Sequence, residues 1–355
     1  MSDIDTRAPA VTVDPDRAES APMRIAIVTD AWNPQVNGVV RTLTQTKGEL
    51  EAMGHTVLMV TPLAFRTLPC PTYPEIRLSV LPGRGVKRML EAFRPEAVHI
   101  ATEGPLGWSA RGYCLAQGIG FTTAYHTRFP EYVWHRFGMP LALTYGMLRR
   151  FHGPATRVMV PTPTVKRDLE ARGFRRVVLW SRGVDTAVFQ PGDRALLADT
   201  RPIFLYVGRV AVEKNVEAFL ALDLPGTKWV VGEGPQLAEL KAKYPEVRYA
   251  GVMSQAELAR YYDSADVFVF PSRTDTFGLV LLEAMACGLP VAAYPVTGPV
   301  DVVGGSPGAA LDDDLRAACL KALTLSRTAA RDHAAGYSWA ACTKQFAGYL
   351  RPVHS

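Results

Sequence analysis

Short apolar runs alternate with longer amphipathic segments along the first half of the chain. Five of these runs are rich in β-branched residues and read as buried parallel strands: RIAIVTD (24–30), HTVLMVTP (55–62), AVHIAT (97–102), FTTAYH (121–126) and RVMVPT (157–162). The segments between them have the spacing of amphipathic helices. Gly54, Gly118 and Gly173 stand where those helices should end, because glycine readily adopts the left-handed conformation of a helix cap.

The rhythm breaks at residues 181–202, which have the composition of a loop, and then it restarts. Five further runs predict strands: PIFLYVGR (202–209), KWVVGEG (228–234), VRYAGVM (247–253), VFVFPS (267–272) and VAAYP (291–295). Two consecutive series of strands and helices joined by a linker predict an α/β protein with two Rossmann-like domains facing a central cleft. We place the domains at residues 23–185 and 200–325.

Composition narrows the class of protein. The chain has 355 residues, of which 48% are hydrophobic and 21% charged, enough core for two domains. Residues 1–22 are polar and lack the apolar stretch of a signal peptide, so we expect a flexible leader. The five cysteines lie far apart without a C-x-x-C pair, which argues against a zinc site or a disulfide framework and favours a reducing cytosol. No run approaches the roughly 18–20 apolar residues that cross a bilayer.

Candidate chemistry gathers just after the predicted strands, where open parallel sheets bind ligands. Arg209 and Lys214 follow one strand of the second series, and the stretch PSRTDTFGLVLLEAMACGLP (271–290) follows another. A helix beginning near Phe277 would present free backbone N–H groups, and Gly278 would let an anion approach closely. Together with the two cations, this pattern indicates a diphosphate site.

Two carboxylates in the same stretch, Asp275 and Glu283, are separated by seven residues. Their charge is wrong for phosphate, so they are better explained as acceptors for sugar hydroxyls on either side of a diphosphate. Simpler interpretations stay open: Glu283 as an exposed helix residue, Asp275 as an N-cap, and Arg209 with Lys214 as solvated surface. The position of all four at strand-to-helix junctions favours a nucleotide-sugar site.

These motifs carry a family resemblance. VGRVAVEKN, VGEGP, SRTDTFGLVLLEAMACGLPVAA and the early TDAWNPQVNGVVRTL resemble the retaining GT-B glycosyltransferases whose mark is two acidic residues separated by seven. The resemblance runs from Met23 to the C-terminus. LPCPTYPEIRLSV and YHTRFPEYV are most similar to the branch that glycosylates diacylglycerol, which includes sulfoquinovosyl-, glucosyl- and glucuronosyl-diacylglycerol synthases and related lipid mannosyltransferases. The family resemblance also implies that a C-terminal helix within residues 336–355 crosses back to the first domain.

The resemblance also implies roles for single residues. The residues that match the family's donor site are Gly38, His126, Arg209, Lys214, Asp275, Phe277, Gly278, Leu279, Glu283, Gly251 and Val252. Of these, Gly251 and Val252 hold the base through their backbone. Within this set His126 contacts the donor sugar, Arg209 and Lys214 hold phosphate, and Glu283 binds the ribose. Thr102, Glu103 and Arg128 are candidates for the acceptor side. Many relatives have glutamate where this chain has Asp275, which leaves the sugar open.

The implied reaction moves a sugar with retention from a nucleotide sugar, UDP-linked rather than GDP-linked, without a metal ion or cofactor. UDP-glucose, UDP-glucuronate and UDP-galactose are the expected donors, and diacylglycerol is the expected acceptor. Alternatives on the same fold are a soluble transferase for polysaccharide or small glycosides, a GDP-mannose-dependent mannosyltransferase, or a nucleotide-sugar epimerase. A dinucleotide-dependent oxidoreductase is excluded because VGEGPQL lacks the last glycine of G-x-G-x-x-G.

Charge is uneven along the chain. Residues 121–180 carry ten Lys and Arg against three acids, and WHRFGMPLALTYGMLRRFHG interleaves arginines with apolar side chains. Such a face in the N-terminal domain suits an anionic leaflet, which indicates a cytoplasmic protein held peripherally at the inner face of the cytoplasmic membrane. The alternative is a core with a solvated basic rim. Nucleic acid is not an expected partner, because no binding motif accompanies the charge.

Overall fold

The computed structural model describes residues 21–35, 37–70, 73–128, 130–131 and 138–350. They form two compact units, one of residues 21–182 with 339–350 and the other of residues 183–338. Most of the predicted leader, and residues 132–137 of the predicted basic face, lie outside the described residues.

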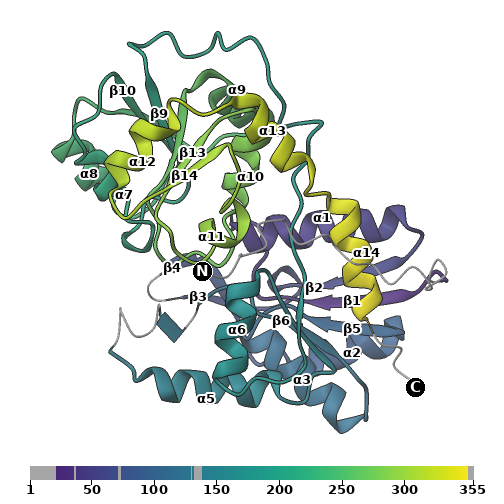
Figure 1. Ribbon diagram of the computed structural model, residues 1–355. Helices are drawn as coiled ribbons and strands as arrows, with labels where there is room; N and C mark the ends of the chain where they lie inside the picture. Colours follow the sequence, from purple (N-terminus) through teal and green to yellow (C-terminus); the bar gives the residue numbers. More distant parts are fainter. Residues whose placement is uncertain (1–20, 36, 71–72, 129, 132–137, 351–355) are drawn as a thin grey trace. The chain divides into compact units, whose positions relative to one another are not determined.

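The first unit is built on a six-stranded parallel sheet with the order β2-β1-β5-β6-β7-β8 (Figure 1). The sequence predicted five of its strands, β1 (Arg24–Val28), β2 (Thr56–Val60), β5 (Ala97–Ile100), β6 (Thr122–Ala124) and β7 (Arg157–Val160), and the structure confirms them. It did not predict β8 (Val177–Leu179) or the antiparallel hairpin of β3 (Thr67–Cys70) and β4 (Tyr73–Ser79). The hairpin was missed because prolines interrupt its pattern of strand residues.

Helices cover both faces of this sheet (Figure 1). Apolar residues of four helices form one core with the sheet: α2 (Gly83–Phe93), α3 (Pro105–Ala116), α5 (Leu141–His152) and α6 (Pro163–Ala171). On the other face, α14 (Trp339–Tyr349) packs beside α1 (Gly38–Ala52). The predicted cap glycines have φ angles of +88° at Gly54, +68° at Gly118 and +83° at Gly173, so these helix ends are confirmed.

The second unit has a six-stranded parallel sheet with the order β11-β10-β9-β12-β13-β14. Its strands are β9 (Ile203–Val207), β10 (Thr227–Val231), β11 (Arg248–Ala250), β12 (Val267–Phe270), β13 (Val291–Ala293) and β14 (Ala309–Leu311); the sequence predicted all but β14. Alternate residues of β12 enter different cores: Phe268 and Phe270 join one, Val267 and Val269 the other. Burial on both faces explains why these strands read as unbroken apolar runs.

One of these two cores contains residues of α9 (Gln255–Ser264), α10 (Leu279–Ala286), α11 (Pro299–Val302) and α13 (Arg327–Ala335). The other contains residues of α7 (Val216–Leu220), α8 (Leu237–Lys243) and α12 (Leu315–Ala322). The strand order changes direction between β9 and β12. The loops that follow these two strands therefore diverge, and open sheets bind their ligands in the crevice at this switch point.

Candidate functional site

The loops after β9 and β12 are fastened to each other at the switch point of the second unit. The hydroxyls of Ser272 and Thr274 donate to the carbonyl of Glu213 at 3.3 and 3.2 Å. The side-chain amide of Asn215 donates to the carbonyl of Pro271 at 3.1 Å. These bonds hold together two segments that are about 60 residues apart in the chain, a separation at which packing rather than local propensity sets the geometry.

Lys214 and Asp275 form an ion pair across this junction. The Lys214 Nζ lies 2.5 Å from Oδ1 of Asp275, and the two side chains are 24% and 16% exposed. The other carboxylate oxygen, Oδ2, is buried and has no hydrogen-bond partner among the described residues. The ion pair lies at the edge where the sequence predicted a phosphate-binding cation and a sugar-binding acid.

The N-terminus of α10 lies directly after this pair. Helix α10 begins at Leu279 and its N-cap residue is Gly278, so Asp275 is not the N-cap. Gly278 has a φ of +84°, a left-handed conformation that side chains disfavour. A Cβ there would lie 3.0 Å from Leu281 Cδ1 and 3.1 Å from a ring carbon of Phe270. The backbone of residues 277–279 thus turns sharply into a helix whose first N–H groups suit an anion.

Replacing Gly278 with alanine is expected to lower the free energy of unfolding by about 1–2 kcal/mol, because an L-residue is strained in the left-handed region. Urea denaturation measures this change. Gly48→Ala is the matched control: a Cβ at this position in α1 meets nothing within 4 Å, so alanine should raise the free energy of unfolding instead. Unchanged stability of Gly278→Ala would contradict the strained turn.

Glu283 lies in the second turn of α10 and is only 3% exposed, so it is not an ordinary surface residue. The hydroxyl of Tyr262 in α9 donates to its Oε2 at 3.3 Å. A carboxylate held inside the protein needs hydrogen-bond partners to offset its lost hydration. The Tyr262 hydroxyl is such a partner for the Glu283 carboxylate.

The glycines of VGR and VGEG let the loops after β9 and β10 touch through their backbones. A Cβ on Gly232 would lie 2.0 Å from the Gly208 carbonyl oxygen, and one on Gly234 would lie 2.2 Å from that of Val210. Arg209 lies between these contacts, and its carbonyl accepts a hydrogen bond from the Tyr206 hydroxyl at 2.8 Å. Burial raises the pKa of Tyr206, and Asp275 and Glu213 raise it further. Sequence reasoning had missed Tyr206, which lies in the buried strand.

The predicted base-binding residues form an exposed loop after β11. Gly251 and Val252 are both exposed, Val252 by 56%. The loop ends at Ser254, which caps α9 through a reciprocal box with Glu257. This box fixes where the loop meets the helix and leaves the backbone of residues 251–253 accessible.

In the first unit, His126 follows β6 and contacts two aromatic or cationic neighbours. Its Nδ1 lies 3.2 Å from Nη2 of Arg182, and its ring packs edge-on against Trp180 with centroids 5.8 Å apart. Burial lowers the pKa of His126 well below the ordinary value, and Arg182, His99 and His152 lower it further. Gly38 is the first residue of α1, which Asn37 caps, and it is exposed.

Asp30, at the end of β1, is a polar residue that sequence reasoning missed. Its carboxylate accepts hydrogen bonds from the backbone of Leu106 and Gly107 and from the hydroxyl of Thr102. Burial raises the pKa of Asp30 despite these bonds, which lower it. Thr102 is therefore committed to holding Asp30 against the N-terminus of α3. In the sequence, the signal for Asp30 was an acid directly after a buried strand.

The two other acceptor candidates are held by polar side chains. Glu103 Oε1 lies 3.1 Å from Nε2 of the buried His152, whose Nδ1 is 2.8 Å from the Thr123 hydroxyl. Arg128 Nη2 lies 2.6 Å from Oδ2 of Asp168. These groups follow β5 and β6, so the structure places them at the carboxyl edge of the first sheet with fixed orientations.

Comparison with known proteins gives the two halves separate matches. Residues 36–188 match the sequence profile of Glycosyltransferase Family 4, and residues 201–325 match that of Glycosyl transferases group 1. The second of these regions contains the switch point between β9 and β12.

Among similar proteins, a GDP-mannose-dependent alpha-mannosyltransferase of Mycobacterium tuberculosis is 30% identical over 79% of this chain and 81% of its own length. An alpha-monoglucosyldiacylglycerol synthase of Streptococcus pneumoniae is 28% identical over 77% of this chain and 71% of its own. The crystal structure of HepE from Anabaena, in complex with UDP-glucose, has a TM-score of 0.67 with 16% identity, covering 92% of this chain and 98% of that one. The chain belongs to the glycosyltransferases of the GT-B fold, with a family 4 region followed by a group 1 region.

Proposed function

We propose that this glycosyltransferase is a retaining, metal-independent enzyme that moves a sugar from a nucleotide sugar to a lipid acceptor, diacylglycerol or a close relative. The observation that carries the donor half of the proposal is the Lys214–Asp275 ion pair directly before the N-terminus of α10. A cation, a carboxylate and free helix N–H groups at one switch point suit a diphosphate with a sugar attached.

In this proposal the donor diphosphate lies against residues 277–279, with Lys214 and Arg209 stabilising the negative charge that grows on it as it leaves. Asp275 accepts a hydroxyl of the transferred sugar and Glu283 accepts those of the ribose. The bond from the anomeric carbon to the phosphate oxygen breaks, and the acceptor oxygen bonds to that carbon on the same face. Bond formation on the face that the phosphate leaves keeps the configuration, and the departing phosphate takes the acceptor's proton.

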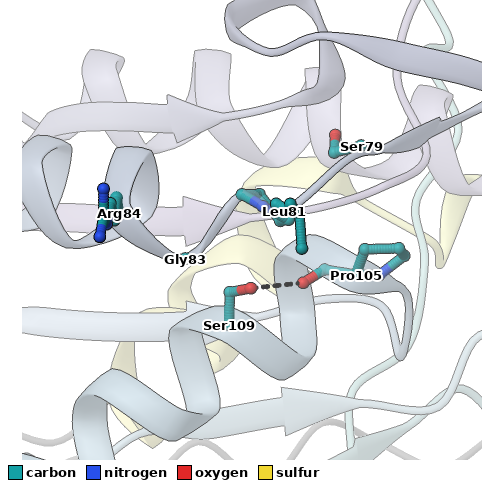
Figure 2. Close-up of a pocket in the computed structure, with 7 residues that line it drawn as sticks. Ser79, Leu81, Gly83, Arg84, Pro105 and Ser109 are labelled. Atoms are coloured by element: carbon teal, nitrogen blue, oxygen red, sulfur yellow. Dashed lines mark hydrogen bonds between the residues drawn. The ribbon is translucent and has the colours of Figure 1, made fainter.

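A lipid acceptor is supported by the surface around α2 in the first unit. Leu81 is 92% exposed, and Val80, Leu63 and Leu68 are exposed as well. Figure 2 shows the hollow beside Leu81; its lining residues are Ser79, Leu81, Pro82, Gly83, Arg84, Pro105 and Ser109. Exposed apolar side chains next to a basic helix suit the boundary between headgroups and acyl chains.

Two basic segments of the first unit would face the anionic leaflet. Helix α2 exposes Arg84, Lys87 and Arg88, and α5 exposes Leu143 and Met147 ahead of arginines in its last turn. No helix in the described ranges combines the length and the apolar character of a membrane span. The exposed basic and apolar side chains of α2 and α5 support the proposal of a peripheral location at the inner face of the cytoplasmic membrane.

The donor is proposed to be UDP-linked, which the UDP-glucose complex of the structurally similar HepE supports. A second candidate is GDP-mannose, which the 30% identical mannosyltransferase favours by its name. A panel of UDP- and GDP-linked sugars, offered with diacylglycerol in anionic vesicles, separates the two by the mass of the lipid product. Hydrolysis of the donor, or transfer of its sugar without any lipid product, would overturn the proposal of a lipid acceptor.

Membrane binding through α2 gives a matched test. The triple change Arg84→Glu, Lys87→Glu, Arg88→Glu should lower the affinity for anionic vesicles by about 100-fold, since each basic residue contributes about 1 kcal/mol to binding near the surface. Sedimentation with the vesicles measures this affinity. The control is Arg260→Glu, Lys321→Glu, Arg331→Glu, which changes three exposed basic residues of the second unit. Equal losses for both variants would show a general charge effect and contradict a docking role for α2.

A further inference from the structure

Arg182 is a buried cation that follows β8. Its side chain is 4% exposed, and its guanidinium stacks on the ring of Trp180 at 4.1 Å. Nη1 donates to the carbonyls of Trp180 and Ser181 at 2.6 and 2.9 Å. These contacts fix the plane of the guanidinium, so the direction of its other amino group is fixed as well.

That other amino group, Nη2, is directed at His126, and only one arrangement of protons satisfies the contact. It lies 3.2 Å from His126 Nδ1. A guanidinium carries donors only, so Nδ1 must be the acceptor. A neutral imidazole has a single N–H, and an accepting Nδ1 places that proton on Nε2. An imidazolium would have no acceptor and would set two cationic N–H groups against each other.

We propose that Arg182 is a positioning residue that holds His126 neutral, with its proton on Nε2, so that His126 acts in sugar transfer as a hydrogen-bond donor and not as a general base. The ring is also held in orientation by Trp180, which packs edge-on against it. His126 thus presents an N–H group whose direction is set by two residues of the segment after β8.

The surroundings of His126 also disfavour its protonation. Arg182 is the permanent positive charge that faces His126, and it lowers the pKa of His126 in addition to burial; His99 and His152 face the same ring. His99 is fully buried against Trp180 and Phe346, and burial lowers its pKa to about 3, so it stays neutral itself. No protonation of His126 is therefore expected in the ordinary histidine range near pH 6.5.

The inference rests on the proposed function only for the partner of the Nε2 proton, a hydroxyl oxygen of the donor sugar. The protonation state itself can be measured on the free protein. A failure of the tautomer is thus distinguishable from a failure of the proposed donor or acceptor.

The test is nuclear magnetic resonance of the full chain labelled with ¹⁵N-histidine, in which long-range couplings between ring nitrogens and carbons report the tautomer. His126→Gln identifies the His126 signals by their disappearance. We expect a neutral Nε2–H ring that does not titrate between about pH 5 and pH 8. A proton on Nδ1, or a titration near the ordinary value of about 6.5, would overturn the proposal.

Variants then assign the effect to Arg182. Arg182→Gln can donate or accept, so part of the His126 population should move its proton to Nδ1, while burial, the largest cause of the lowered pKa of His126, still keeps the ring neutral. Transfer to the lipid acceptor should fall in proportion to the loss of the Nε2–H form, at pH 5.5 and at pH 8 alike. Arg182→Lys restores an obligatory donor and should restore both the tautomer and the rate of transfer.

The exposed Arg175→Gln, in the loop before β8, serves as the control and should change neither readout. If Arg182→Gln does not fold, as judged by circular dichroism, the spectrum of the parent and that of Arg182→Lys still decide the question. An unchanged tautomer and an unchanged rate of transfer in a folded Arg182→Gln would show that Arg182 has only a structural role.

Discussion

Lys214→Ala is expected to lower kcat by about 10²–10³-fold, the usual loss when one group that stabilises developing negative charge is removed. The charge on the leaving diphosphate grows as the bond breaks, so Lys214 interacts more strongly with the transition state than with the bound donor. The KM for the donor should therefore change much less than kcat. Steady-state kinetics with the donor identified in the panel measures both.

The ion pair makes the controls for this prediction important. Removing Lys214 also leaves the carboxylate of Asp275 partly buried without its cation, so the loss could include a change in the position of the loop. Lys214→Ala combined with Asp275→Asn removes that charge; if kcat recovers, the single variant had acted through Asp275. Lys321→Ala, an exposed lysine of α12, should leave kcat unchanged. A rise in the KM for the donor with kcat unchanged would contradict the proposed interaction of Lys214 with the leaving group.

Glu283→Gln is expected to weaken donor binding by about ten- to a hundred-fold with little change in kcat. A hydrogen bond to a charged group contributes about 1.5–3 kcal/mol, and glutamine keeps the shape and the bond from Tyr262 while removing the charge. Calorimetric titration with UDP and with GDP measures the affinity. The effect should appear with whichever nucleotide the parent binds.

A nucleotide lacking a ribose hydroxyl sharpens this prediction. The parent should lose affinity for the deoxy form, whereas Glu283→Gln should bind both forms almost equally, because the interaction partner is already gone. Glu239→Gln, an exposed residue of α8, is the matched control and should bind like the parent. If the losses of affinity caused by Glu283→Gln and by removal of the ribose hydroxyl were fully additive, a ribose contact by Glu283 would be contradicted.

The strands of both sheets could be predicted wherever they are buried on two faces, because such strands must be apolar throughout. The exceptions have identifiable reasons. β8 and β14 are edge strands that are only partly buried, and the β3–β4 hairpin is interrupted by proline. Helix ends were predictable because a left-handed residue strongly favours glycine.

The roles of single polar residues followed less directly from the chain. Taken alone, Asp275 read better as an N-cap, and Glu283 read equally well as an exposed residue, since the sequence pattern around a carboxylate does not reveal its burial. Asp30 and Tyr206 were missed because each lies within or at the end of an apolar strand. The partner of Asp30, on α3, comes from 76 positions away, and the partner of Tyr206 is the carbonyl of Arg209 in the loop after β9.

By itself the sequence determined the two series of buried strands, the helix ends and the set of polar residues that follow the strands, because each depends on a local pattern of side chains and backbone freedom. Only the tertiary structure decided which of those residues meet. Lys214 contacts Asp275 from 61 positions away, and Arg182 contacts His126 from 56. The order in which strands pair brings such distant residues together, and that order depends on the packing of the whole unit rather than on any segment of it.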